Sequence, residues 1–324
     1  MGPKIIGVEF GSETLKLSVC SGKKVLYMAV ERFPEGLVTD GRVSAPATMI
    51  QFVKQMCAEH KIGRGPCALV INSQNTIARK LQMPVMGEAE LKLNLPFEFR
   101  DFVGKDANKY EYDYAMVQVK DNLMDVYAAA VRKDLLEEYG NILRKAGLTL
   151  KAAMPEEMAW LNIVRAAENK PKQLCIVDIG AAHTRVNIFA NDQYVMGKDI
   201  DIGGRRFDDA IAAAEKVEQL VARLHKEENV NNVTTLPGCA DLYAQLSVEI
   251  MRIINFYCSS TPDGNDLQDI YFCGGCSSID ALRTAIIKRT NFTTHHIRRL
   301  LELSGTDYVS EFCALSAGAA MQVR

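Results

Sequence analysis

The stretch IGVEFGSETLKLSV at residues 6–19 returns in altered form as CIVDIGAAHTRVNI at residues 175–188. In each copy an apolar run leads into a turn with an acid and a glycine, and a second run with alternating character follows, which predicts two strands joined by a hairpin. Matched positions keep their charge or size, pairing Glu9 with Asp178, Gly11 with Gly180 and Lys16 with Arg185. A repeat present twice at so wide a separation predicts two related domains rather than a solenoid.

The two turns share the chemistry of a phosphate site. A glycine lets the backbone come close to a ligand, neighbouring N–H groups can point at phosphate oxygens, and a carboxylate can hold the water shell of a cation. Two such turns can bind one phosphate chain from both sides. A single turn of this kind would be an ordinary connection between strands, so it is the duplication that indicates a binding site.

The composition is that of a soluble globular protein, with 324 residues of which 48% are hydrophobic and 24% are charged. Lysine and arginine number 38 against 40 acids, a net charge of -2, which argues against nucleic acid and anionic lipid as general partners. No apolar run approaches the roughly 20 residues of a membrane-spanning helix, and the N-terminus begins with a strand rather than a signal segment. We therefore expect a cytoplasmic protein.

The nine cysteines occur singly and mostly within apolar stretches, which is typical of reduced core thiols. Cys273 and Cys276 form a C-x-x-C pair of the kind found in redox sites and in half of a zinc site. The sequence has no second such pair, and His295 and His296 are the only histidines nearby, so both alternatives are disfavoured.

The first half of the chain is predicted to form a lobe at 1–170, in which an inserted α/β subdomain at 76–147 separates the core segments 1–75 and 148–170. The predicted core elements after the first hairpin are strands at 25–30, 67–71 and 148–153 and helices at 47–60 and 155–167. The predicted elements of the insert are strands at 77–83, 112–119 and 124–131, a helix start at 87–91, and a helix at 133–146 that Gly147 ends.

The second half is predicted to form a lobe at 171–324, with a helical subdomain at 203–265 between the core segments 171–202 and 266–324. A linker signal at 169–172 precedes it. Its predicted elements after the second hairpin are a strand at 195–202, a helix from about 208, a continuing helix at 215–225, a polar loop at 229–238, an amphipathic helix at 242–257, a buried strand at 270–273 and a small apolar helix at 313–321.

This order of parts resembles the actin-like (ribonuclease H-like) ATPase fold, with two lobes, duplicated mixed β-sheets flanked by helices, and an inserted subdomain of the type found in the cell-division protein FtsA. Within that superfamily the chain is similar to the type IV pilus assembly protein PilM family over essentially its whole length. The motifs that carry the resemblance are VDIGAxxT at 177–184, IGG at 202–204, LxxEIxRxxxFY at 246–257 and CGG at 273–275.

The resemblance implies that the chain binds ATP with Mg²⁺ and that Glu9 and Asp178 hold the metal. It implies that the other nucleotide-binding residues are Gly11, Ser12, Glu13, Thr14 and Lys16 in the first turn, Gly180, Ala181, Ala182, His183 and Thr184 in the second, and Gly203, Gly204, Glu215, Gly274, Gly275 and Cys276. Of these, Gly274 and Gly275 would lie against the adenosine, and Glu215 near the ribose or base.

The sequence departs from the family pattern at four positions. Glu9 replaces an aspartate, Asp208 replaces a threonine that follows Gly-Gly, Glu218 replaces a lysine, and His183 precedes Thr184. Asp208 is expected to cap a helix, as threonine does. Backbone amides supply most of the grip on a phosphate, so these changes preserve a site. Hydrolysis also needs an aligned water, and the sequence identifies no residue that would orient it.

The leading hypothesis is a cytoplasmic, ATP-binding assembly factor of a type IV pilus or a related secretion machine, whose nucleotide state sets its grip on a membrane partner. The resemblance implies that this partner is a PilN-like inner-membrane protein, which the inserted subdomain and its neighbour bind through a short cytoplasmic peptide. The protein would then be peripheral to the inner membrane through PilN. Any ATPase activity would be weak or dependent on a partner.

Three alternatives stay open at this point. A degenerate binding module without nucleotide would explain Glu9 and Glu218. A sugar-kinase-like phosphotransferase would need an aspartate base, for which Asp40 and Asp201 are the candidates. An FtsA-like tethered filament is disfavoured because no C-terminal amphipathic helix follows Met321, while self-association as such is left open.

The inserted subdomain has a high density of aromatic residues, including Phe97, Phe99 and tyrosines at 110, 112 and 114. Core packing explains some of them, and a peptide docked on an exposed strand edge would explain others. We expect Phe97 and Phe99 to contact the partner, and their burial distinguishes the two explanations.

Overall fold

The structure is a computed structural model that describes residues 2–39, 41–262, 264–289, 292–303 and 309–321. The chain divides into two compact units, Met1–Ala159 with Leu315–Arg324 (unit 1) and Trp160–Ala314 (unit 2). Both boundaries fall within helices, α5 (Glu156–Ala166) and α10 (Val309–Ala320), rather than at residue 170. The sequence-based lobes and subdomains stay a prediction.

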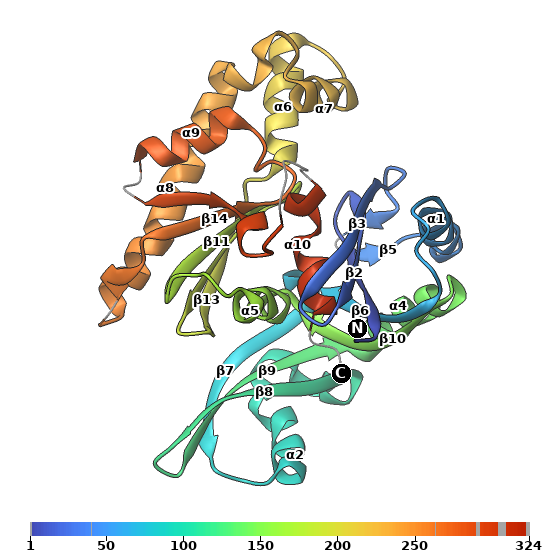
Figure 1. Cartoon of the computed structure of the whole chain (residues 1–324), viewed down its shortest axis with the longest axis vertical. Helices are drawn as coiled ribbons and strands as arrows, with labels where there is room; N and C mark the ends of the chain where they lie inside the picture. The colour runs from blue at the N-terminus through green and yellow to red at the C-terminus, as the bar shows by residue number, and fades with distance from the viewer. Residues whose placement is uncertain (1, 40, 263, 290–291, 304–308, 322–324) are drawn as a thin grey trace. The chain divides into compact units, whose positions relative to one another are not determined.

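Unit 1 is built on a five-stranded mixed sheet in the order β10-β6-β1-β2-β3. The strands are β1 (Lys4–Phe10), β2 (Thr14–Ser21), β3 (Lys24–Arg32), β6 (Gly65–Ile71) and β10 (Leu148–Pro155). β1, β2 and β3 are antiparallel neighbours, and β6 and β10 add parallel strands on the other side of β1. Helices α1 (Pro46–Glu59) and α4 (Lys133–Lys145) and the short hairpin β4 (Val38–Thr39) and β5 (Arg42–Val43) share a hydrophobic core with this sheet (Figure 1).

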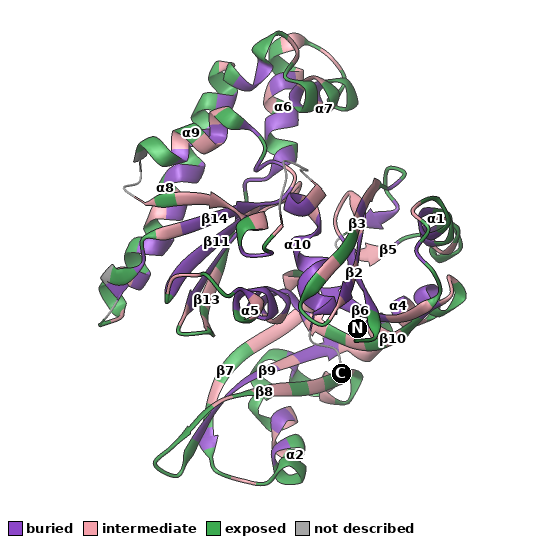
Figure 2. Cartoon of the chain, viewed as in Figure 1, coloured by how far each residue is buried: buried purple, intermediate pink, exposed green. Residues whose placement is uncertain are grey.

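Unit 2 repeats this topology in the order β13-β12-β11-β14-β15. The strands are β11 (Gln173–Ile179), β12 (Thr184–Ala190), β13 (Gln193–Ile200), β14 (Asp269–Cys273) and β15 (Thr293–His296). Again three antiparallel strands are followed by two parallel ones. Helices α8 (Pro237–Ser260) and α9 (Asp280–Arg289) bury their apolar faces against this sheet, whose central strands are buried in Figure 2. The fold predicted from the repeat, with duplicated mixed sheets flanked by helices, is confirmed.

A three-stranded antiparallel sheet in the order β7-β9-β8 forms the inserted subdomain within unit 1. Its elements are β7 (Thr76–Pro84), α2 (Glu88–Glu98), α3 (Arg100–Val103), the 3-10 helix η2 (Gly104–Lys109), β8 (Tyr110–Lys120) and β9 (Leu123–Arg132). Leu91, Leu95 and Phe99 pack with Met124 and Val126 of β9 in a separate small core. α2 continues past the predicted start at 87–91, and Pro96 lies inside it.

The C-terminal helix α10 explains a glycine in β1. A Cβ atom on Gly7 would lie 1.6 Å from the Ser316 carbonyl oxygen, so only glycine allows this approach. Ser18 of β2 and Ser316 share a hydrogen bond of 2.7 Å, and the Cys20 thiol lies 3.7 Å from the Ala317 carbonyl oxygen. The small residues of α10 therefore allow close packing on the sheet, as the sequence predicts.

The helical part of unit 2 differs from prediction in two places. α6 (Gly204–Glu215) and α7 (Gln219–Glu228) are separate, because Lys216 adopts a left-handed conformation with φ of 56° and ends α6. The predicted continuous helix at 215–225 is therefore wrong. The predicted polar loop at 229–238 contains the 3-10 helix η3 (Val230–Thr235) and the start of α8.

Candidate functional site

The second acid-glycine turn joins β11 to β12 in unit 2. The Gly180 N–H donates to the His183 carbonyl at 3.0 Å. Thr184, fully buried at the start of β12, donates its hydroxyl to the Ile202 carbonyl at 2.7 Å. The turn is thus tied to itself and to the segment that follows β13.

The start of α6 lies against this turn. The Gly204 N–H donates to the Gly180 carbonyl and the Arg205 N–H to the Ala181 carbonyl, each at 2.9 Å. A Cβ atom on Gly203 would lie 2.5 to 2.7 Å from backbone atoms of residues 181–183, so glycine is required there. The turn's carbonyls therefore satisfy the first two N–H groups of the helix, which would otherwise lack partners.

Three consecutive N–H groups of the turn are left for a ligand or for water. Among the described residues, the backbone N–H groups of Ala181, Ala182 and His183 have no hydrogen-bond acceptor. All three residues are half-buried. Successive N–H groups in a turn form a concave site for an anion, so the arrangement suits a phosphate.

The loop after β14 adds a third segment. Gly274 has φ of 87°, and a Cβ atom on it would lie 2.5 Å from Asp178 Oδ1 and 2.4 Å from the Ile179 carbonyl oxygen. The Cys276 N–H donates to that carbonyl at 3.1 Å. A Cβ atom on Gly275 would meet the Phe312 ring at 2.7 Å. The structure therefore brings together Asp178, the turn at 180–184, Gly203, Gly204 and the loop at 274–276.

A buried acid lies behind this loop. The Glu311 carbonyl accepts the Gly274 N–H at 2.8 Å, and Glu311 Oε1 is 3.1 Å from His296 Nδ1. Burial raises the pKa of the Glu311 carboxyl to about 7, against the opposing charges of Arg298 and Arg283 and the Ile297 N–H. Burial lowers the pKa of His296, as do the same two arginines.

The first turn, in unit 1, repeats the backbone geometry of the second. The Gly11 N–H donates to the Thr14 carbonyl at 2.9 Å, the same bond that Gly180 and His183 form. The Glu13 carbonyl accepts the Phe33 N–H, also at 2.9 Å. Ser12, which was also predicted to bind the nucleotide, lies between Gly11 and Glu13 in this turn. The repeat in sequence is thus a repeat in backbone structure.

The acid of each turn faces a basic residue across the hairpin. Glu9 is buried and forms an ion pair with Lys16, which faces it across the β1–β2 ladder. Arg185 holds the matching position opposite Asp178, and its guanidinium also donates a hydrogen bond to Asp199 at 2.7 Å. Glu9 and Asp178 remain the predicted metal ligands.

Glu215 is not part of the cluster around Gly204. It lies at the other end of α6, roughly 16 Å along the helix axis at 1.5 Å per residue. Its carboxylate binds His225 Nδ1 at 2.6 Å. The predicted role of Glu215 near the ribose or base therefore concerns a different part of the nucleotide from the phosphates.

Sequence reasoning missed the role of Asp208 and did not identify Lys226. Asp208 was expected to cap a helix, but α6 begins at Gly204 with Gly203 as its N-cap, so Asp208 is one turn inside. Its carboxylate, 1% exposed, is 2.5 Å from Lys226 Nζ and 3.4 Å from Arg223 Nε, both on α7. Asp208 and Lys226 lie on different helices, 18 residues apart in the sequence, so no local sequence motif indicates that they pair.

Two buried acids at the end of β10 in unit 1 were also missed. Glu156 and Glu157 begin α5, with exposed fractions of 9% and 4%. They follow β10 at the same edge of the sheet at which Gly11 follows β1, because β1, β6 and β10 run parallel. Ligands of open α/β sheets bind outside the carboxyl ends of parallel strands. Glu156 and Glu157 could have been identified as candidates from the sequence, because a helix that starts with two acids directly follows a strand.

The cysteines carry no metal or disulfide signal in the described part of the chain. All nine are free, and eight are buried. No group of three histidine, cysteine or acidic side chains gathers there as a metal site would require. Cys276 instead packs on Gly204, since a Cβ atom at 204 would lie 2.7 Å from its sulfur.

The two phenylalanines predicted to contact a partner differ in burial. Phe99 is 0% exposed and packs in the core of the inserted subdomain. The prediction that it contacts a partner is therefore wrong, because its side chain is needed for core packing. Phe97 is 71% exposed on α2, as is Leu93 at 73%, one turn earlier. Phe97 therefore keeps its prediction as a partner contact.

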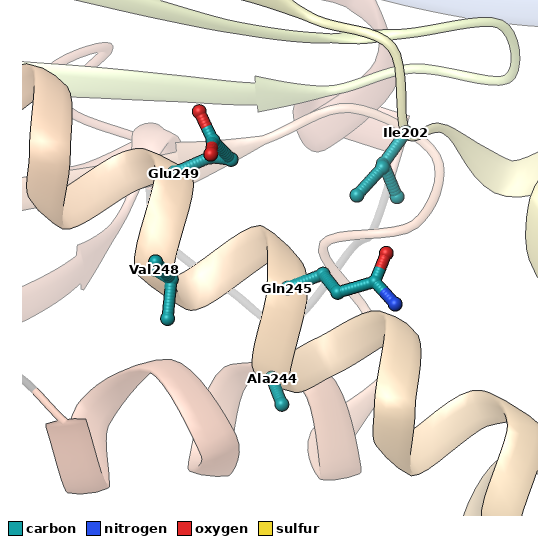
Figure 3. Close-up of a pocket in the computed structure, with 5 residues that line it drawn as sticks. All are labelled: Ile202, Ala244, Gln245, Val248 and Glu249. Carbon is teal, nitrogen blue, oxygen red and sulfur yellow. The ribbon is translucent and has the colours of Figure 1, made fainter.

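An open pocket of about 380 Å³ lies beside α8 in unit 2. Figure 3 shows its lining, in which the side chain of Gln245 extends toward Ile202, and Ala244, Val248 and Glu249 are the other lining residues of α8. Ile202 is the residue whose carbonyl accepts the Thr184 hydroxyl. The pocket thus adjoins the segment to which the turn at 180–184 is bound, without including the N–H groups of that turn.

Solved structures confirm the fold. The chain matches a structure described as the PilM-PilN type IV pilus biogenesis complex, with a TM-score of 0.82, 20% identity, and coverage of 99% of this chain and 98% of that chain. The ethanolamine utilization protein EutJ from Carboxydothermus hydrogenoformans matches with a TM-score of 0.61 and 15% identity over 99% and 90% of the two chains. MreB5 of Spiroplasma citri bound to ADP matches with a TM-score of 0.55 and 14% identity over 97% and 94%.

The family follows from a match that spans nearly the whole sequence. The model of the type IV pilus assembly protein PilM family matches residues 7–312, which include both repeated turns, the inserted subdomain and the loop at 274–276. The chain therefore belongs to the type IV pilus assembly protein PilM family, and it has the actin-like fold.

Proposed function

We propose that this protein is an ATP-binding assembly factor of a type IV pilus or a related secretion machine, and that its nucleotide state sets its grip on a membrane partner. The observation that carries the proposal is the turn at 180–184, where three consecutive N–H groups lack an acceptor among the described residues. A phosphate supplies the acceptors that such a turn needs.

Two further observations support a nucleotide as the ligand. Gly274 and Gly275 bring a loop without side chains against this turn, since a Cβ atom on either would meet Ile179 or Phe312, and the backbone of this loop is proposed to contact a base or a ribose. MreB5, which has the same fold, is described in complexes with ADP and with AMPPNP. When bound, Mg²⁺ would neutralise phosphate charge, and Glu9 and Asp178 are the carboxylates proposed to hold its water shell.

The proposed partner is a PilN-like inner-membrane protein, and the proposed docking element is the inserted subdomain. The structure described as a PilM-PilN complex supports this pairing. Phe97 and Leu93 form an exposed apolar pair on α2 of that subdomain. None of the helices in the described part of the chain is long and apolar enough to cross a membrane. We therefore propose that PilN holds this protein at the cytoplasmic face of the inner membrane.

Titration of the nucleotide-stripped protein with ATP and ADP, with and without Mg²⁺, tests nucleotide binding. Melting temperature and released phosphate are followed together, and Asp178→Ala is the control variant. Magnesium-dependent stabilisation that the variant loses, with little phosphate released, supports an ATP-dependent scaffold. Absence of stabilisation by either nucleotide refutes nucleotide binding and favours a nucleotide-free binding module, in which the ion pair of Glu9 with Lys16 is purely structural.

Fluorescence anisotropy with a labelled peptide from the cytoplasmic end of the PilN-like protein tests the partner. Phe97→Ala should weaken peptide binding. The matched control is Leu220→Ala, which removes a 57% exposed leucine on α7 in unit 2. Equal binding by both variants and the unaltered protein would exclude Phe97 from the docking surface.

A further inference from the structure

The pair of Asp208 and Lys226 lies against the first turn of α6. Lys226 Nζ is 2.5 Å from Asp208 Oδ1 and donates a hydrogen bond to the Gly204 carbonyl at 3.0 Å. The lysine side chain is 8% exposed and the aspartate 1%. Removing such charges from water costs several kcal/mol unless they are paired. The ion pair with Asp208 offsets this cost for the buried ammonium of Lys226.

The peptide group between Gly204 and Arg205 forms hydrogen bonds at both of its ends, and Lys226 binds its carbonyl. The same peptide carries the N–H of Arg205, which donates to the Ala181 carbonyl at 2.9 Å. Hydrogen bonds in a chain polarise one another, so an ammonium on the carbonyl strengthens what the N–H donates. Lys226 is therefore linked through one peptide group to the turn whose N–H groups have no acceptor among the described residues.

We propose that Lys226 is a positioning residue for the phosphate turn. By holding the peptide between Gly204 and Arg205, it keeps Ala181 in place, so that the N–H groups of residues 181–183 stay directed at the ligand. The inference rests on the proposed nucleotide binding and names the residue of α7 on which that binding depends.

The competing explanation is that Lys226 is only a counter-ion for Asp208. Arg223 separates the two explanations, because it contacts the same carboxylate from the same helix, at 3.4 Å. Asp208→Asn removes the charge that either cation would balance. In the Asp208→Asn background, a lysine or arginine that served only to balance the charge of Asp208 no longer has that role. The effect of the hydrogen bond from residue 226 to the Gly204 carbonyl can then be measured separately.

The experiment measures the Kd of a fluorescent ATP analogue with Mg²⁺ and the melting temperature of each variant. In the Asp208→Asn background we compare Lys226→Met, Lys226→Gln and Arg223→Met. We expect Lys226→Met to weaken binding about tenfold, the loss of one hydrogen bond from a charged donor. Lys226→Gln, whose amide can donate to the Gly204 carbonyl, should recover most of the affinity, and Arg223→Met should stay within about twofold of the Asp208→Asn protein.

Two results overturn the inference while leaving the proposed function intact. One is that Lys226→Met in the Asp208→Asn background binds the analogue as tightly as the Asp208→Asn protein. The other is that methionine and glutamine weaken binding equally at equal melting temperatures, since then the donor at residue 226 has no influence. If the unaltered protein does not bind the analogue, both the proposed function and this inference fail.

Discussion

Replacing Glu311 with glutamine should make the protein more stable at neutral and alkaline pH. Glu311 is 2% exposed, and burial raises the pKa of its carboxyl from the ordinary 4.5 to about 7. Between these two values the folded protein holds a proton that the unfolded chain releases. Stability therefore falls as the pH rises from 4.5 to 7, and the loss is complete above 7.

The size of this loss follows from the shift in pKa. Each pKa unit corresponds to 1.36 kcal/mol, so Glu311 should cost about 3 kcal/mol of unfolding free energy at pH 8 relative to pH 4.5. Glu311→Gln carries no titrating group and avoids this loss. The two proteins should be similarly stable at pH 5, and the variant should be more stable by up to about 3 kcal/mol at pH 8.

Urea unfolding followed by circular dichroism at pH 5, 6, 7 and 8 measures this difference. Asp280→Asn is the matched control, because this acid contacts Arg283 at 3.0 Å but its side chain is 86% exposed. The control should stay within about 0.5 kcal/mol of the unaltered protein at every pH. A difference between Glu311→Gln and the unaltered protein that does not change with pH would refute the reasoning from burial.

Three further predictions follow from close contacts and burial. Gly274→Ala should destabilise the protein by about 2 kcal/mol and weaken nucleotide binding in the same titration, because φ is positive there and a Cβ atom would meet backbone at 2.4 Å. Gly7→Ala should cost about 3 kcal/mol in urea unfolding without touching the turn, because its Cβ would overlap the Ser316 carbonyl. Phe99→Ala should cost about 3 kcal/mol or more in the same assay, whereas Phe97→Ala should change stability by less than about 0.5 kcal/mol.

The sequence predicts well those features that depend on local alternation and on glycine. Each repeated hairpin could be recognised because strand periodicity and the turn glycine lie within a few residues of one another. The glycines at 203, 204, 274 and 275 were also predicted together. The structure shows that a Cβ atom on Gly203 or Gly274 would overlap backbone atoms, whereas one on Gly204 or Gly275 would need the side chain of Cys276 or Phe312 to move.

Features that depend on distant partners could not be predicted. Lys226 and Asp208 meet only because α7 packs beside α6, after a left-handed break at Lys216 that no proline or glycine announces. Glu311 becomes a buried acid only because the start of α10 meets the loop at 274–276. In each case the decisive contact joins elements that the sequence shows as independent amphipathic segments.

Phe97 and Phe99 show why the length of a helix matters. The sequence predicted only a helix start at 87–91, so both phenylalanines were expected to contact a partner. The helix instead continues to Glu98. Leu91, Leu95 and Phe99 then lie on one face, four residues apart, and Phe97 lies on the opposite face with Leu93. The period of the helix, once its length is known, separates the buried aromatic residue from the exposed one.

What the two repeated turns preserve most closely is backbone geometry. Gly11 and Gly180 make the same hydrogen bond, whereas the acid is a glutamate in one copy and an aspartate in the other, and Arg185 also binds Asp199. Phosphate binding by N–H groups requires only the preserved part. Magnesium binding and the orientation of an attacking water require the side chains, which is where the copies differ from each other and from the family pattern. A duplicated site can therefore keep its affinity for a nucleotide while its rate of hydrolysis changes, which is the behaviour expected of a scaffold that responds to ATP.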